Sequence, residues 1–285
     1  MITVRGAGPL TTVQDRGRPG HAHLGVPRAG ALDRPAAELA QRLVGNDPDA
    51  ALLEIVMGGF AATTSSGCWV AVTGAAGSLR IGGVAGAHGE AVWWPAGAEL
   101  SIATPAGGMR SCLAVAGGID VEQVLGSRST DTLAWVGPPV VRDGDRLPVG
   151  AATATPRPLD VPPPARRGPL RVTPGPRDDW FDPAAWQTLS RSAYVVTTES
   201  NRIGLRLDGP ELPRARTGEL ASEGMVLGAV QVPPDGRPVV FLADHPPTGG
   251  YPVIGVVRTE DLWQCAQLRP GDEVRFTPDR AAATR

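Results

Sequence analysis

The sequence contains no lysine, because all 27 of its Lys and Arg residues are arginine. This absence excludes a Schiff base on this chain, the lysine of a P-loop, and a carrier lysine for biotin or lipoate. A reaction with ATP or biotin would need a partner to carry that site, unless arginines and backbone amides bind the phosphates. A coding bias that replaces surface lysine with arginine explains the absence as well, and the exclusions hold in either case.

Cysteine is also scarce, with three residues at Cys68, Cys112 and Cys265. Their odd number and wide spacing argue against a disulfide framework and against a zinc site. We expect all three to be small core residues.

Long apolar runs are missing, and no stretch approaches the roughly 20 residues of a membrane-spanning helix. The start, MITVRGAG, lacks a basic segment followed by an apolar one. The net charge is −2 with both signs interspersed, which gives no electrostatic footprint for nucleic acid. We therefore expect a soluble cytoplasmic protein with neither a membrane nor a nucleic acid as partner.

Glycine and proline are abundant, at 37 and 29 residues, and valine is frequent. This composition is typical of many short strands joined by tight turns, so the predicted fold is mainly β with a few short helices. The length of 285 residues favours two domains. A proline-rich stretch at 152–169 separates them, and we place the domains at 1–155 and 168–280.

The clearest helix signal is LDRPAAELAQRLVGN, in which Asp33 is the predicted N-cap, Pro35 lies in the first turn and Gly45 with Asn46 ends the helix. A second helix is predicted in DDWFDPAAWQTL, capped by Asp179 or Asp182. Most other apolar runs are four to seven residues long and separated by breakers, as in a barrel or sandwich. The segment PPDG, residues 233–236, predicts a hairpin turn.

Four polar clusters interrupt the predicted strands in glycine-rich loops. They are VQDRGRPG near residue 15, LGSRSTDTL at 125–133, TESNRIGLRLDGP near residue 202, and LADHPPTGGYPVIG near residue 245. Each alone is explained by a turn or a helix cap. Their recurrence favours a common pocket for a small substrate with a carboxylate and an amide.

Three further features have structural and functional interpretations. His21 and His23 are two residues apart, but no neighbouring cysteine or carboxylate completes a metal site, so we predict no metal. Glu54 interrupts an apolar strand and needs a partner such as arginine if buried, whether it is structural or a base of raised pKa. Trp93 and Trp94 are expected on opposite faces of a strand.

No serine-nucleophile, Rossmann or P-loop fingerprint is present. The order of the longer motifs, however, resembles the family labelled allophanate hydrolase subunit 2 over roughly residues 6–277. That family includes the C subunit of bacterial 5-oxoprolinase and the matching part of the urea carboxylase carboxyltransferase domain. The motifs are TTVQDRGRPG, GVPRAGALDRPAAELAQRLVGN, ALLEI, VAGGID, LGSRSTDT, SNRIGLRLDG, SEGMVLGAVQVPPDGRPVV, TGGYPVIGVV and AQLRPGDEVRF.

The resemblance implies tandem cyclophilin-like β-barrels and a partner of the allophanate hydrolase subunit 1 type, like the B subunit of 5-oxoprolinase, with a third subunit in some members. It implies ATP-dependent opening of the cyclic amide 5-oxoproline to glutamate. Alternatives within the family are carboxyl transfer from biotin to urea, with the biotin on another chain, and a regulatory binding role. Mg and ATP would be bound in a site completed by a partner.

This chain departs from the family pattern at two places. VGPPVVRDGD stands where a second Gly-Arg usually follows the Ser-Thr-Asp element, and Asp244-His245-Pro246-Pro247 stands where Asp-Arg-Gln-Thr usually precedes TGGY.

The candidate site residues come from the four clusters. We predict one of three carboxylates as the base that positions water, and arginines for anion binding. The catalytic candidates are Asp15, Asp131 and Asp244; the substrate-binding candidates are Gln14, Arg18, Ser129, Thr130, Asn201, Arg202, Arg206, Thr248 and Tyr251.

Overall fold

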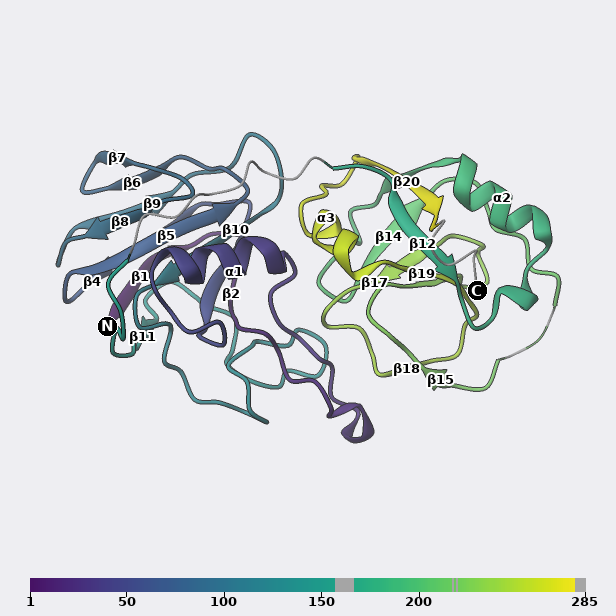
Figure 1. Cartoon of the computed structure of the whole chain (residues 1–285), viewed down its shortest axis with the longest axis horizontal. Helices are drawn as coiled ribbons and strands as arrows, with labels where there is room; N and C mark the ends of the chain where they lie inside the picture. The colour runs from purple at the N-terminus through teal and green to yellow at the C-terminus, as the bar shows by residue number, and fades with distance from the viewer. Residues whose placement is uncertain (157–166, 217, 219, 280–285) are drawn as a thin grey trace. The chain divides into compact units, whose positions relative to one another are not determined.

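A computed structural model describes residues 1–156, 167–216, 218 and 220–279 (Figure 1). The chain forms two compact units, an N-terminal unit of residues 1–19, 29–131 and 135–164, and a C-terminal unit of residues 20–28, 132–134 and 165–285. Much of the proline-rich stretch expected to separate the domains lies outside the described residues. Among those that are described, no helix is long and apolar enough to cross a membrane.

The N-terminal unit contains two antiparallel sheets. In spatial order, the first consists of β11 (Arg146–Leu147), β1 (Ile2–Ala7), β4 (Phe60–Thr64), β9 (Glu99–Ile102), β6 (Leu79–Ile81) and β7 (Val84–Gly86). The second consists of β2 (Leu10–Gln14), β3 (Leu52–Val56), β10 (Arg110–Val115), β5 (Cys68–Gly74) and β8 (Ala91–Trp94). Apolar side chains from both sheets share one core. The unit is thus built from two sheets around one core.

The second sheet is covered on its other face by α1 (Arg34–Leu43), which packs on β5 and β10. All six residues of β10 are buried because successive side chains point to opposite faces and both faces are covered. Leu113 faces the core shared by the sheets, whereas Cys112 packs with the alanines of α1. Asp33 accepts a hydrogen bond from the Ala36 amide at 3.0 Å, which confirms the predicted N-cap.

Glu54 lies in the middle of β3 with a fully buried side chain. Its carboxylate is 3.4 Å from the Arg110 guanidinium and accepts a hydrogen bond of 2.8 Å from the Leu32 amide. The expected arginine partner is therefore present. Burial, with Asp33 and Glu54 nearby, raises the pKa of the neighbouring Cys112 thiol and keeps it neutral. Glu54 thus joins β3, β10 and the segment that leads into α1.

Trp93 and Trp94 lie on opposite faces of β8, as expected from the alternation of a strand. Trp94 is completely buried, whereas Trp93 is 47% exposed. Cys112 and Cys265 are buried and Cys68 is partly buried, all three with free thiols. The cysteines are therefore small interior residues, as predicted.

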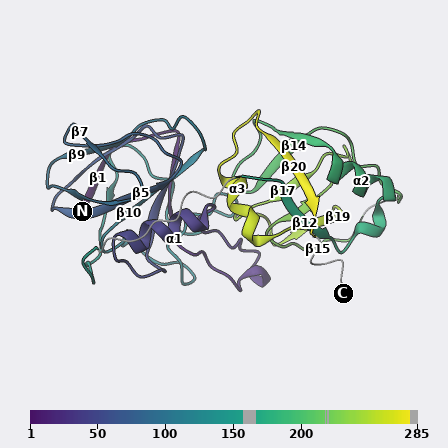
Figure 2. The same cartoon turned by 45° about the horizontal axis from the view of Figure 1, so that its top comes forward.

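The C-terminal unit is a closed barrel (Figure 2). Its strands follow in the order β12 (Leu170–Pro174), β19 (Val253–Val257), β16 (Ala229–Gln231), β17 (Val239–Phe241), β14 (Gly204–Asp208), β13 (Ala193–Val196) and β20 (Glu273–Pro278). β15 (Glu223–Gly224) and β18 (Thr248–Gly249) form a separate two-stranded sheet. The short helices are η1 (Ala22–Leu24), η2 (Asp178–Trp180), α2 (Pro183–Arg191), η3 (Thr259–Asp261) and α3 (Leu262–Ala266). This unit is the closed barrel that the resemblance implied.

Local signals in this unit correspond to the observed elements. Asp182 caps α2 by accepting a hydrogen bond of 2.7 Å from the Ala184 amide, so it is the cap among the two aspartates considered. The Gly236 amide donates to the Pro233 carbonyl at 3.0 Å, and Gly236 has a φ of 74°, which a glycine adopts without strain. This turn joins β16 to β17 as predicted.

We expect Arg110→Met to lower the free energy of unfolding by about 3–5 kcal/mol, because it leaves the buried Glu54 carboxylate without its cation. Arg275→Met is the matched control, since the Arg275 and Glu273 side chains are 52% and 57% exposed and such pairs contribute less than about 1 kcal/mol. Urea titration of the full chain measures both variants. Equal losses in the two variants would contradict the structural role of the Glu54 pair.

Candidate functional site

The first two polar clusters meet around the Asp15 carboxylate in the N-terminal unit. Asp15 Oδ1 accepts hydrogen bonds from the Ser127 hydroxyl at 2.6 Å, the Ser129 hydroxyl at 2.6 Å and the Gly17 amide at 2.7 Å. Its Oδ2 accepts one from the Arg128 amide at 2.6 Å. The Asp15 amide in turn donates to the Ser129 hydroxyl at 2.9 Å. We call Asp15, Gly17, Ser127, Arg128 and Ser129 the Asp15 clasp.

Gln14, Arg18 and Thr130 extend the clasp through backbone carbonyls. Gln14 Nε2 donates to the Thr130 carbonyl at 3.0 Å and to the Thr12 hydroxyl at 3.0 Å. Arg18 is 2% exposed and donates from Nε to the Val124 carbonyl at 3.3 Å and from Nη2 to the Ser129 carbonyl. These bonds hold residues 14–18 and 124–130 together, although more than a hundred residues separate them in the chain.

The clasp changes how its members are interpreted. Four donors occupy the Asp15 carboxylate, so this side chain organises two loops instead of standing ready to take a proton. Arg18 is similarly engaged with carbonyl oxygens. Gln14 Oε1 and Thr130 Oγ1 differ from the Asp15 carboxylate. Both atoms are buried, and neither has a hydrogen-bond partner within the described part of the chain. A buried polar atom without a partner is destabilising, so these two atoms favour a water or a polar ligand group beside them.

The other buried cluster belongs to the C-terminal unit and is built on Arg202 and Asp244. Arg202 Nε and Nη2 donate to the two carboxylate oxygens of Asp244, each at 3.0 Å, and the side chains are 1% and 0% exposed. Thr132 adds two hydrogen bonds to Asp244 Oδ2, from its amide at 3.0 Å and its hydroxyl at 2.7 Å. We call Thr132, Arg202 and Asp244 the Arg202–Asp244 cluster. Its bidentate geometry fixes the guanidinium in one orientation.

Thr132 binds the Asp244 carboxylate, although the sequence did not single it out as a candidate. It directly follows the Ser-Thr-Asp motif that ends at Asp131, and this position next to the motif was the feature of the sequence that could have identified it. Residues 132–134 belong to the C-terminal unit, although the residues on either side of them belong to the N-terminal unit. Only the tertiary contact with Asp244 shows which residue of the motif binds there.

The remaining predicted residues lie in different surroundings. Asp131 is completely buried, and its amide donates to the Val136 carbonyl at 3.1 Å. Asn201 accepts hydrogen bonds from the amides of the following turn, while Arg206 is exposed on β14 and lies 4.0 Å from Glu199. Thr248 is exposed on β18.

Tyr251 is 44% exposed, and the guanidinium carbon of Arg214 lies 6.0 Å from the centre of its ring. Arg214 was not a candidate from the sequence, because a cation facing an aromatic ring 37 positions away leaves no local signal. The convergence of all four clusters on one pocket stays a prediction.

His21 directly precedes the short helix η1 and His23 lies within it, so the two do not share a strand face; their ring centres are 6.4 Å apart. Across the described residues, no group of three or more His, Cys, Asp or Glu side chains is arranged to hold a metal ion.

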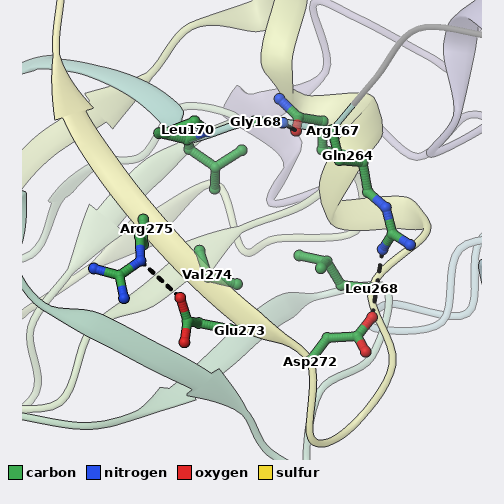
Figure 3. Close-up of a pocket in the computed structure, with 10 residues that line it drawn as sticks. Arg167, Gly168, Leu170, Gln264, Leu268, Asp272, Glu273, Val274 and Arg275 are labelled. Carbon is green, nitrogen blue, oxygen red and sulfur yellow. Dashed lines mark hydrogen bonds and ion pairs between the residues drawn. The ribbon is translucent and has the colours of Figure 1, made fainter.

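One pocket of the C-terminal unit, of about 390 Å³, lies beside β20 and α3 (Figure 3). Its charged groups bond mainly to one another: Arg275 to Glu273 at 2.7 Å, and Arg167 to Asp272 at 3.4 Å. Gln264 accepts a hydrogen bond from the Gly168 amide at 2.7 Å. None of the candidate site residues lines this pocket, and its paired charges do not indicate a ligand.

We expect Asp15→Asn to lower the free energy of unfolding by about 1–3 kcal/mol, because an amide group would face a donor in place of one carboxylate oxygen. Hydrogen exchange of the Gly17 and Arg128 amides should accelerate with it. Asp47→Asn is the control, since the exposed Asp47 carboxylate accepts one hydrogen bond, from the Asp49 amide. Unchanged exchange at both amides would show that the clasp does not hold the loops.

We expect Arg202→Met to cost at least about 3 kcal/mol of unfolding free energy, because it leaves the Asp244 carboxylate buried without its cation. Arg206→Met tests an exposed arginine four residues away and should change stability by less than about 1 kcal/mol. Thermal and urea unfolding of the two variants, measured side by side, distinguish them. A loss of similar size in both would contradict the buried pairing.

Comparison with known proteins adds to this geometry. Residues 24–278 match the family model described as carboxyltransferase domain, subdomain A and B. The chain is 40% identical over 280 residues to the C subunit of 5-oxoprolinase from Escherichia coli (strain K12), covering 97% of this chain and 90% of that protein. It is 32% identical to urea amidolyase of Lachancea kluyveri, covering 96% of this chain and 17% of that protein.

Solved structures show the same fold. A crystal structure of TTHA0988 has a TM-score of 0.88 and 38% identity, covering 97% of this chain and 55% of that one. The structure of the K. lactis urea amidolyase has a TM-score of 0.89 and 30% identity, covering 97% of this chain and 18% of that one. The chain thus spans about half, or less, of the solved chains it matches. The family match over most of the chain confirms the resemblance seen in the motifs, and the protein belongs to the carboxyltransferase domain, subdomain A and B, family.

Proposed function

We propose that this chain is a subunit of an ATP-dependent cyclic amide hydrolase that opens 5-oxoproline to glutamate. The observation that carries the proposal is the 40% identity to a protein named as the C subunit of 5-oxoprolinase, over 97% of this chain. A second protein of that name, from Haemophilus influenzae, is 29% identical over 97% of the chain. The word subunit in both names supports an assembly of several chains.

Within that assembly, we propose a partner of the allophanate hydrolase subunit 1 type, like the B subunit of 5-oxoprolinase, together with a third subunit, acting in the cytoplasm. The proposed substrate is small and neutral at its amide. A lactam N–H and carbonyl are complementary to Gln14 Oε1, which accepts, and to the Thr130 hydroxyl, which donates. The Asp15 clasp would hold both residues in position without taking part in proton transfer.

The described residues do not fit a complete Mg–ATP site. The sequence has no lysine and no P-loop, and the described part of the chain holds no cluster of metal-binding side chains. Arg18 and Arg202 are engaged with protein oxygens, and Arg206 is the exposed arginine among the three anion-binding candidates. We therefore propose that partner chains supply the nucleotide site, and we derive no step of the reaction through ATP.

A carboxyltransferase of the urea carboxylase type is the second candidate. It is supported by the description of the family and by the urea amidolyases, which are 32% identical but much longer than this chain. Because the chain has no lysine, the biotin of such an enzyme would be attached to another chain. A regulatory binding protein without turnover is the third.

The test is reconstitution of the chain with its subunit 1-type partner and the third subunit. We expect glutamate to form from 5-oxoproline only when ATP is present, and formation to fall to background when this chain is left out. Avidin should have no effect. Fixation of labelled bicarbonate on urea that avidin blocks would favour the carboxyltransferase, and stable complex formation without turnover of 5-oxoproline, urea or allophanate would favour regulation.

A further inference from the structure

A second pocket of the C-terminal unit, of about 460 Å³, lies where α2 begins. Its lining residues come from β12, from η2 and the start of α2, and from β19 (Figure 1). All of them belong to the C-terminal unit. The lining combines two aromatic rings, those of Phe181 and Trp186, with three carboxylates, those of Asp178, Asp179 and Asp182. We call the pocket that these residues line the α2 pocket.

The start of α2 explains the aromatic floor of the α2 pocket. Asp182 is the N-cap and Pro183 the first helical residue. Phe181 precedes the cap and Trp186 is the fourth helical residue, and these are the two positions of a hydrophobic staple. Phe181 is 6% exposed, and Trp186 is half-buried. A Cβ on Gly255 of β19 would lie 3.3 Å from the Trp186 ring, so the glycine leaves room for the indole beside the barrel.

The three carboxylates differ in what already balances their charge. Asp179 pairs with Arg216 at 2.8 Å. Asp182 Oδ1 accepts a hydrogen bond of 2.7 Å from the Ala184 amide, and its charge is favourable at the positive end of the helix dipole. Asp178 is exposed, and no described residue forms a hydrogen bond or ion pair with its carboxylate. The α2 pocket therefore carries negative charge that the described chain does not fully balance.

The combination of aromatic rings and carboxylates fits an arginine side chain. The apolar stem of arginine packs on apolar surface, its planar guanidinium stacks on an aromatic ring, and its N–H groups bind carboxylates. Lysine carries the same charge but lacks the planar group. An anion would be repelled by the carboxylates, and a neutral apolar group would leave them without a counter-charge.

We propose that the α2 pocket receives an arginine side chain of the partner chain in the assembly proposed above, on which this inference rests. The guanidinium stacks on Trp186 and pairs with Asp178, and Asp182 adds to the negative charge around it. A second chain is supported by the relatives named as subunits. The sequence beyond residue 279 contains Arg280 and Arg285, so the tail of this chain is the competing occupant.

The first test uses the full chain without a partner. The probe is the peptide acetyl-Ala-Arg-Ala-amide, and ¹H–¹⁵N spectra follow the indole N–H signals of the seven tryptophans, among which Trp186→Phe identifies that of Trp186 by its loss. We expect this signal to shift as peptide is added, and less so at high salt, which screens exposed charges. The same peptide with citrulline, the neutral isostere of arginine, should cause no shift. Equal shifts with both peptides, or none with either, would overturn the proposal.

A chain without residues 280–285 separates the partner from the tail. For a pocket that awaits a partner, the deletion leaves the Trp186 signal and the affinity for the arginine peptide unchanged. A Trp186 signal that moves on deletion, together with a peptide that binds only the shortened chain, would show that the tail occupies the pocket and would overturn the partner proposal.

The second test measures binding of the subunit 1-type partner. Asp178→Asn combined with Asp182→Asn removes both charges, while asparagine at 182 still caps the helix. The Kd for the partner should rise about tenfold or more, because two charge contacts are lost. Asp235→Asn is the matched control, since Asp235 is also exposed and accepts an amide hydrogen bond, from Arg237 at 3.1 Å, but lies in the hairpin turn at 233–236. Equal Kd values for the double variant and the wild type would contradict the docking role.

The outcomes separate the two proposals. An assembly that opens 5-oxoproline but binds the double variant as tightly as the wild type refutes the role of the α2 pocket alone. An assembly that does not open 5-oxoproline refutes the proposed function, and the affinities of the two variants still decide whether the partner docks at this pocket. A loss of affinity with an unchanged unfolding midpoint supports docking over a structural effect.

Discussion

Buried carboxylates can be accommodated only when donors match their oxygens, and this constraint organises both units of the protein. Glu54 binds Arg110 and the Leu32 amide and thereby joins a strand to the entry of α1. Asp15 gathers two distant loops by accepting four hydrogen bonds. Asp244 is matched by Arg202 and by a residue from a segment far away in the chain. The hydrogen bonds and ion pairs of these buried carboxylates therefore help to position the surrounding loops, together with apolar packing.

The same constraint separates residues that position a site from residues that are free to react. An aspartate in a glycine-rich loop has the composition expected of a general base, but Asp15 and Asp244 have their oxygens occupied by protein donors. Gln14 Oε1 and the Thr130 hydroxyl, in contrast, are buried and have hydrogen-bonding capacity that the described residues do not use. Neutral polar groups with unused hydrogen-bonding capacity are therefore better candidates for contact with a substrate than the carboxylates of Asp15 and Asp244.

Local signals predicted much of the fold. The cap at Asp33, the hairpin turn at 233–236, the opposite burial of Trp93 and Trp94, and an arginine beside Glu54 were all expected from residue type and spacing. The cap, the turn and the alternation of the tryptophans depend on residues close in sequence. The arginine beside Glu54 follows from the general rule that a buried carboxylate needs a cation, whichever arginine supplies it. Strand spacing alone does not say which strands pair, so the two sheets of the N-terminal unit and the closed barrel of the C-terminal unit come from the tertiary structure.

The sequence by itself determined the mainly β composition, the N-cap of α1, the exclusion of lysine chemistry and, through its motifs, the family. Tertiary structure alone decided that Thr132 binds Asp244, that Ser127 and Ser129 bind Asp15, and that His245 stacks on Phe241 with its Nδ1 hydrogen bonded. The physical reason is distance along the chain. Periodicity, caps and turns act over a few residues, whereas a buried carboxylate or imidazole acquires its state from groups that only folding brings within about 3 Å.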